Sequence, residues 1–208
     1  QGEGRQRFEA FLPLLCEMAA NEANPDTALT RALPFVRAVC RRSAYLVLLQ
    51  ENPAALKHLL SLVAASTWVA DRLASRPELL DELLHEAQLF SAPNRDEIKA
   101  LVRQQLLRIP EEDLEGQMSA LGRIKEGVIL RVAASELSGT LPVMQVSDNL
   151  TFLAEVMIEQ AIAVARAQLV QRYGEPEAKQ VGFAVMAYGK LGGIELSYGS
   201  DLDLVFVF

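Results

Sequence analysis

The sequence predicts a mostly α-helical protein: a helical bundle followed by the first two strands of a truncated α/β domain. Apolar residues recur at steps of three and four from Arg5 to about Tyr173, which is the spacing of one helix face. Prolines, capping residues and glycines divide this stretch into several helices. Towards the carboxyl end, residues 181–189 and 201–208 form two short apolar runs with the composition and alternation of β-strands.

Capping residues predict where several helices begin. Pro53 and Pro77 each precede an apolar-periodic segment, so each is expected at the first helical position, where its missing N–H costs nothing. Asn94, with Glu97 three residues later, is typical of a capping box. Three acidic residues follow Pro110, and we expect them in the first turn of the next helix because the helix dipole favours negative charge there.

Two long helices are expected after Pro110. The first carries an apolar stripe that we expect to lie in the core, and Gly139 is its natural stop. The second runs from about Asp148 to Tyr173, with Gly174 after it. The stripe of the first helix consists of Leu114, Met118, Leu121, Ile124, Val128 and Val132.

One linker divides the chain into two regions. Composition changes after the segment "GEPEAK", residues 174–179. We therefore expect a helical region over 1–175 and the incomplete start of another domain over 176–208. The chain begins with Gln1 and not with methionine, as expected for a piece of a longer protein.

Charge and composition argue against several classes of protein. The formal net charge of −7 does not provide the basic field of a nucleic-acid binder. No apolar run reaches the roughly 18 residues of a membrane span, so we expect no membrane association. Cys16 and Cys40 lie in partly apolar helical patterns and are expected to be buried thiols in the reducing cytoplasm.

Two carboxylates stand at the start of the last predicted strand, "DLDLVFVF". In a strand, Asp201 and Asp203 project to the same side, with Cα atoms less than about 7 Å apart. Two anions held this close repel each other unless they share a cation, and hard oxygen ligands select magnesium or manganese. The alternative is that the aspartates cap loops or pair with lysines elsewhere.

A glycine-rich segment precedes the two aspartates. Gly189, Gly192, Gly193 and Gly199 would allow backbone N–H groups to approach a phosphate chain, and Ser200 adds a hydroxyl. The alternative is a tight turn between strands, which needs only one or two glycines. The Walker loop and the dinucleotide fingerprint G-x-G-x-x-G are both absent.

The segment "YGKLGGIELSYGSDLDLVF", residues 188–206, resembles the signature of glutamine synthetase adenylyltransferases, also called glutamate–ammonia-ligase adenylyltransferases. These belong to the DNA polymerase beta-like nucleotidyltransferase superfamily. The helical part is similar as well, in "RRSAYLVLLQENPAAL", "LLRIPEEDLE" and "LPVMQVSDNLT". The resemblance thus covers nearly the whole chain and identifies its end as the first strands of a nucleotidyltransferase domain.

The resemblance implies a reaction in which AMP passes from ATP to a tyrosine of glutamine synthetase, in the regulation of nitrogen assimilation. Asp201 and Asp203 would be the catalytic carboxylates and would hold Mg²⁺. Gly192, Gly193 and Ser200 would bind the β and γ phosphates. Lys190 is a further candidate for phosphate contact, with a solvated surface lysine as the alternative. The third carboxylate of the superfamily is not in this sequence, so the piece alone is expected to be inactive.

Family members carry two nucleotidyltransferase domains, one that attaches adenylyl groups and one that removes them by phosphorolysis. The version "SYGSDLDL" resembles the carboxy-terminal, adenylylating copy, and the deadenylylating copy is the alternative. A different class of function is also open: the helical region would then be a docking module for glutamine synthetase or for a PII signalling protein.

Overall fold

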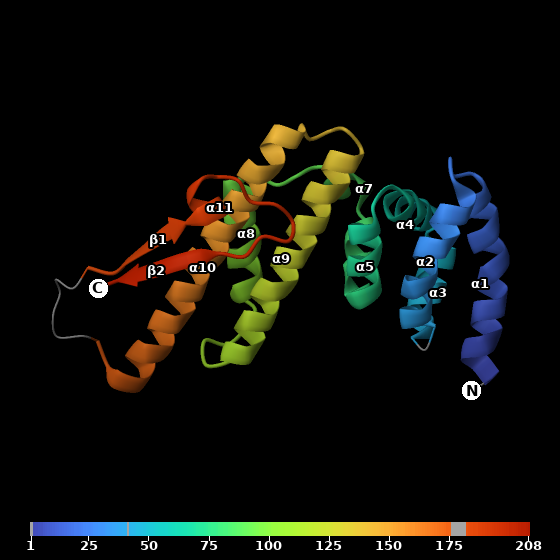
Figure 1. The fold of residues 1–208 in the computed structure, drawn as a ribbon. Helices are drawn as coiled ribbons and strands as arrows, with labels where there is room; N and C mark the ends of the chain where they lie inside the picture. Colours follow the sequence, from blue (N-terminus) through green and yellow to red (C-terminus); the bar gives the residue numbers. More distant parts are fainter. Residues whose placement is uncertain (1, 41, 176–181) are drawn as a thin grey trace. The chain divides into compact units, whose positions relative to one another are not determined.

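The computed structural model describes residues 2–40, 42–175 and 182–208, which form two compact units, residues 1–90 and 91–208 (Figure 1). The predicted fold class, mostly helical with two strands, is confirmed. The predicted boundary between 175 and 176, and the start of the first predicted strand, fall at residues 176–181, which lie outside the described residues.

The first unit is a set of short helices around an aliphatic and aromatic core. Helix α2 packs against α4 and α5, and α1 packs against α2 and α3. Phe11 of α1 and Phe35 of α2 are completely buried. The helices of this unit are α1 (Gly2–Ala20), α2 (Pro25–Val39), α3 (Ser43–Glu51), α4 (Pro53–Ala65), α5 (Thr67–Ser75), the 3₁₀ turn η1 (Pro77–Leu79), α6 (Leu80–Leu83) and α7 (Glu86–Leu89).

The cysteines of this unit differ from the prediction of buried thiols. Both are free, but Cys16 is exposed and Cys40 is only half-buried. The prediction was wrong for Cys16 because its neighbour Leu15, with 1% exposure, takes the buried face of α1. Among the helices in the described part of the chain, none is long and apolar enough to cross a membrane.

The second unit is built on three helices: α8 (Arg95–Leu106), α9 (Leu114–Leu137) and α10 (Val143–Tyr173). Each of the three packs against the other two. Their core includes Ile98, Val102, Leu130, Val132 and Val156, which are completely buried.

The predicted helix caps are mostly confirmed. Pro53 and Pro77 each begin an element, although that of Pro77 is the 3₁₀ turn η1. In the capping box of α8, Asn94 Oδ1 accepts a bond from Glu97 N at 3.0 Å, and Asn94 N donates to Glu97 Oε2 at 2.8 Å.

The start of α9 differs from the prediction. The acidic segment after Pro110 is not the first helical turn, because Asp113 is the N-cap and its Oδ1 accepts a bond from Gly116 N at 2.8 Å. The first turns of α9 also leave Leu114 and Met118 exposed, whereas Val128 and Val132 lie in the core as expected.

The ends of the two long helices agree with the glycine pattern. Gly139 and Gly174 follow α9 and α10 with φ of 76° and 81°, a region that favours glycine. Helix α10 begins at Val143, earlier than the predicted Asp148, because the extended backbone of Pro142 provides its N-cap position.

A two-stranded antiparallel sheet completes the second unit. Strands β1 (Ala184–Tyr188) and β2 (Asp203–Val207) are joined through the short helix α11 (Gly189–Gly192), and Tyr188 pairs with Asp203. Apolar residues occupy both faces of the last strand beyond Asp203, which predicts that both of its faces are covered. In the structure most residues of the two strands are exposed instead, because only one face of the hairpin lies against α10 in the described residues (Figure 1).

Candidate functional site

The candidate site lies between the end of β1 and the start of β2. Leu191 of α11 and Leu196 of the following loop are 5% and 4% exposed and fix this connection to the unit. Two backbone bonds close it further: Gly193 N donates to Gly189 O at 3.0 Å, and Glu195 N donates to Lys190 O at 2.7 Å. The connection is therefore a compact, internally bonded turn.

Asp203 and Gly189 are brought into direct contact. Asp203 is the first residue of β2, and a Cβ atom placed on Gly189 would lie only 2.5 Å from Asp203 Oδ2. Gly189 also has a φ of 55°, which side chains of L-residues rarely adopt. The Asp203 carboxylate thus lies against the backbone of Gly189, where β1 meets α11. It fits there because glycine has no Cβ atom.

Asp201 lies two residues before β2, on the exposed loop rather than in the strand. A closed turn precedes it: Ser200 N donates to Ser197 O at 3.1 Å, and Ser197 N donates to Ser200 Oγ at 2.9 Å. Ser200 Oγ and Ser197 Oγ are also 2.9 Å apart and share a hydrogen bond. The predicted phosphate ligand Ser200 therefore also shapes the approach to Asp201.

The other predicted phosphate ligands are arranged around α11. Gly192 packs against the end of β1, since an added Cβ atom would lie 2.6 Å from Ala187 O. Lys190 is exposed on α11. Gly189 and Gly192 therefore both permit close approaches within the turn.

A bond that the sequence did not predict connects this loop to α9. Tyr198 Oη donates to Glu136 Oε2 at 2.5 Å, across 62 residues of sequence. Burial raises the pKa of Tyr198 above its ordinary value, and the hydrogen bond to Glu136 raises it further. Tyr198 lies within the recognised motif, but no spacing rule relates it to Glu136.

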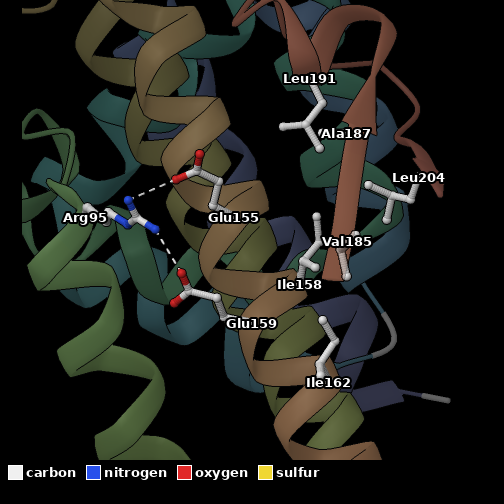
Figure 2. Close-up of a pocket in the computed structure, with 9 residues that line it drawn as sticks. All are labelled: Arg95, Glu155, Ile158, Glu159, Ile162, Val185, Ala187, Leu191 and Leu204. Atoms are coloured by element: carbon white, nitrogen blue, oxygen red, sulfur yellow. Dashed lines mark hydrogen bonds and ion pairs between the residues drawn. The ribbon is translucent and has the colours of Figure 1, made fainter. Parts of the chain in front are cut away.

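A cavity of about 330 Å³ lies between α10 and one face of the hairpin (Figure 2). Ala187 and Leu204 pair directly and both line this cavity, so strand alternation puts the pair Tyr188 and Asp203 on the other face. The cavity is lined by Arg95, Glu155, Ile158, Glu159, Ile162, Val185, Ala187, Leu191 and Leu204.

The charged wall of the cavity is internally paired. Arg95 lies between two carboxylates of α10, with Nη1 3.2 Å from Glu155 Oε2 and Nη2 2.8 Å from Glu159 Oε1 (Figure 2). Lys99 Nζ is 2.9 Å from Glu159 Oε2. The four charges of this wall therefore neutralise one another between α8 and α10. The cavity also lies on the other face of the hairpin from Asp203, so it is a different site from the carboxylates.

The donor set fits a metal brought by a nucleotide. Over residues 2–40, 42–175 and 182–208, no group of three or more His, Cys, Asp or Glu side chains is placed to hold a metal ion. Magnesium is usually bound through only one or two carboxylates, with water and substrate phosphates as its other ligands. Exposed Asp201 and Asp203 suit that mode.

Comparisons with known proteins agree with the resemblance. The model of the family described as glutamate–ammonia ligase adenylyltransferase matches residues 56–208. The chain is 54% identical, over 98% of its length, to the bifunctional glutamine synthetase adenylyltransferase/adenylyl-removing enzyme of Pseudomonas putida. It is 51% identical over its whole length to the protein of the same name from Hahella chejuensis.

The matched relatives are much longer proteins. The chain covers 21% of the Pseudomonas putida protein and 22% of the Hahella chejuensis protein, so it spans about a fifth of the length of these curated relatives. The family match covers well over half of this chain and includes the whole strand–turn–strand site. The chain therefore belongs to the glutamate–ammonia ligase adenylyltransferase family.

Proposed function

We propose that this chain contributes the metal-binding carboxylates and the adjoining helical region of an enzyme that transfers AMP from ATP to a tyrosine of glutamine synthetase. One observation carries the proposal: the Asp203 carboxylate lies over Gly189, at the entry to a glycine-rich turn that leads back to Asp201. This contact puts one carboxylate directly against the glycine-rich segment that we propose as the phosphate side of the site.

Asp201 and Asp203 would hold Mg²⁺ together with the phosphates of ATP. When bound, magnesium supplies neutralisation of the phosphate charge and orients the nucleotide for in-line displacement. For this role, the two carboxylates must not be paired with lysine or arginine side chains of the chain itself. No ion pair joins either of them to a basic side chain among the described residues.

Ser200 would take part in binding the phosphates. If the Ser197 hydroxyl donates in the bond that the two serines share, Ser200 Oγ accepts from both Ser197 groups and keeps its own proton for a phosphate oxygen. Gly192, Gly193 and Lys190 complete the proposed phosphate side. Because Gly193 N already donates to Gly189 O, its contribution requires a shared or exchanged bond.

We assign the chain to the adenylylating copy of the domain because its motif reads "SYGSDLDL". The relatives' name includes an adenylyl-removing activity, so the deadenylylating copy is the alternative within the same family. The helical region would also bind glutamine synthetase or a PII signalling protein in the cytoplasm. This docking role is compatible with both the adenylylating and the deadenylylating copy.

The test is a pair of substitutions, Asp201→Asn and Asp203→Asn, in the full-length enzyme. Each removes a charged oxygen ligand while keeping the side-chain shape. Incorporation of labelled AMP into glutamine synthetase should fall by more than about 100-fold, since groups that only orient metal ligands already contribute about 10–100-fold. Asp148→Asn, at an exposed position of α10, is the matched control and should leave transfer unchanged.

The same variants also separate the alternatives. Phosphate-dependent removal of AMP should continue in both aspartate variants if the site is the adenylylating one. Loss of removal with retained transfer would assign the site to the deadenylylating copy. Retention of both activities would contradict the metal-site assignment.

A further inference from the structure

The loop that carries Asp201 is attached to a helix distant in sequence. Tyr198 lies three residues before Asp201, and its hydroxyl donates to Glu136 Oε2 at 2.5 Å. Hydrogen bonds to an ionised acceptor are shorter and about twice as strong as neutral ones. Tyr198 is half-buried, and burial together with the bond to Glu136 raises its pKa, so its hydroxyl remains a donor at neutral pH.

Glu136 provides a rigid anchor for this bond. It lies in the last turn of α9. The chain reverses after this turn, and several hydrogen bonds to the Ser135 carbonyl hold the reversal in place. Thr140 N and Leu141 N both donate to Ser135 O at 3.0 Å, and Thr140 Oγ1 donates to the same oxygen at 3.1 Å. Because this helix end is fixed by its own hydrogen bonds, it can hold the Tyr198 ring in place.

The turn between Tyr198 and Asp201 transmits that restraint. Residues 197–200 are closed at both ends by the backbone bond Ser200 N to Ser197 O and by the bond from Ser197 N to Ser200 Oγ. The buried Leu196 fixes the other side of the turn. Asp201 is exposed and follows this turn directly, and the Tyr198–Glu136 bond joins this part of the loop to α9.

We infer that Tyr198 is a positioning residue: by its bond to Glu136 it holds the 197–200 turn, and with it Asp201, in the place required for binding metal and nucleotide. This inference rests on the proposed function. It assigns to α9 a direct part in the site, because the end of that helix sets the position of one of the two carboxylates.

The test compares Tyr198→Phe with the unaltered full-length enzyme by two readouts. Amide hydrogen exchange should be at least about tenfold faster at Ser197, Ser200 and Asp201, because the turn loses its anchor. The Mg²⁺ concentration for half-maximal AMP transfer should rise by about 10-fold, the usual effect of removing a group that orients a metal ligand. The thermal midpoint and exchange elsewhere in residues 91–208 should stay close to those of the unaltered enzyme.

Further variants isolate the bond itself. Glu136→Ala should reproduce both effects, and the double variant should add nothing to either single change. Glu136→Gln keeps an acceptor oxygen and should restore much of the protection and of the Mg²⁺ response. Tyr173→Phe removes the hydroxyl of a tyrosine that is 70% exposed and is the matched control, with no change expected in either readout.

Each other outcome overturns the inference. Unchanged exchange at the turn would show that the bond does not hold it, and faster exchange with an unchanged Mg²⁺ response would show that the turn does not position the metal ligand. Loss of protection throughout residues 91–208 would assign Tyr198 to general stability instead. If Asp201→Asn and Asp203→Asn are silent in the transfer assay, it is the proposed function that fails, and the exchange readout still reports on the Tyr198–Glu136 bond.

Discussion

Gly189 and Asp203 show how a single absent side chain shapes the site. The aspartate oxygen lies where a methyl group on Gly189 would be, 2.5 Å from its ideal position, and the glycine backbone has a φ of 55°. Both facts require glycine, one for space and one for backbone conformation. The motif alone indicated that the glycines and aspartates belong to one site, but it did not indicate that Gly189 makes room for Asp203.

Gly189→Ala should therefore lower both stability and transfer activity. The left-handed backbone alone costs roughly 1–2 kcal/mol for a residue with a Cβ, and the close contact with Asp203 adds to this. Urea unfolding monitored by circular dichroism measures the first effect, and AMP incorporation measures the second. Gly122→Ala is the control, because nothing lies within 4 Å of its added Cβ and alanine favours a helix interior by about 1 kcal/mol. Equal stability of the Gly189→Ala variant and the parent would contradict the structural role of this glycine.

At the scale of elements, local signals predicted more than tertiary ones. The Asn94 capping box, the glycine stops after α9 and α10, and both strands were readable because each depends on neighbouring residues only. The exposure of Leu114 and the burial around Leu15 were not, since which helical face is covered depends on elements far along the chain. The same reason applies to Tyr198, whose partner lies 62 residues away.

The packing of α8 on α10 includes an ion-pair network whose contribution depends on pH. A hydrogen bond from Lys99, followed by Arg95, lowers the pKa of Glu159 below its ordinary value of 4.5. A lowered pKa stabilises the fold above pH 4.5, and this contribution is lost as the pH falls through the value of the folded state. This network could not be predicted from local sequence patterns, because Arg95 and Glu159 are 64 residues apart.

Glu159→Gln should reduce the free energy of unfolding at pH 7 by no more than about 0.5–1 kcal/mol, because its partners are partly exposed and screened by solvent. The difference from the parent should shrink as the pH is lowered from 7 to below 4.5. Urea unfolding at several pH values measures this, and addition of salt at pH 7 should reduce the difference as well. A difference that grows on acidification would contradict the assignment.

For the whole molecule, the sequence predicted the order of its parts: helices first, then a strand–turn–strand segment. It did not predict the division into the units 1–90 and 91–208, because that division reflects contacts between helices and not a change in composition. The second unit includes α8 to α10 together with the hairpin. The proposed site and the helices that support it therefore lie in one compact unit.

The most direct test of the central claim is equilibrium binding of ATP with Mn²⁺, a magnesium substitute visible by electron paramagnetic resonance, to the full-length enzyme and its Asp203→Asn variant. We expect the Asp203→Asn variant to bind the Mn²⁺–ATP complex at least about 10-fold more weakly, because it loses a direct oxygen ligand. The Asp148→Asn control should bind it like the parent. Equal affinity of the Asp203→Asn variant and the parent would contradict the claim that this carboxylate holds the metal.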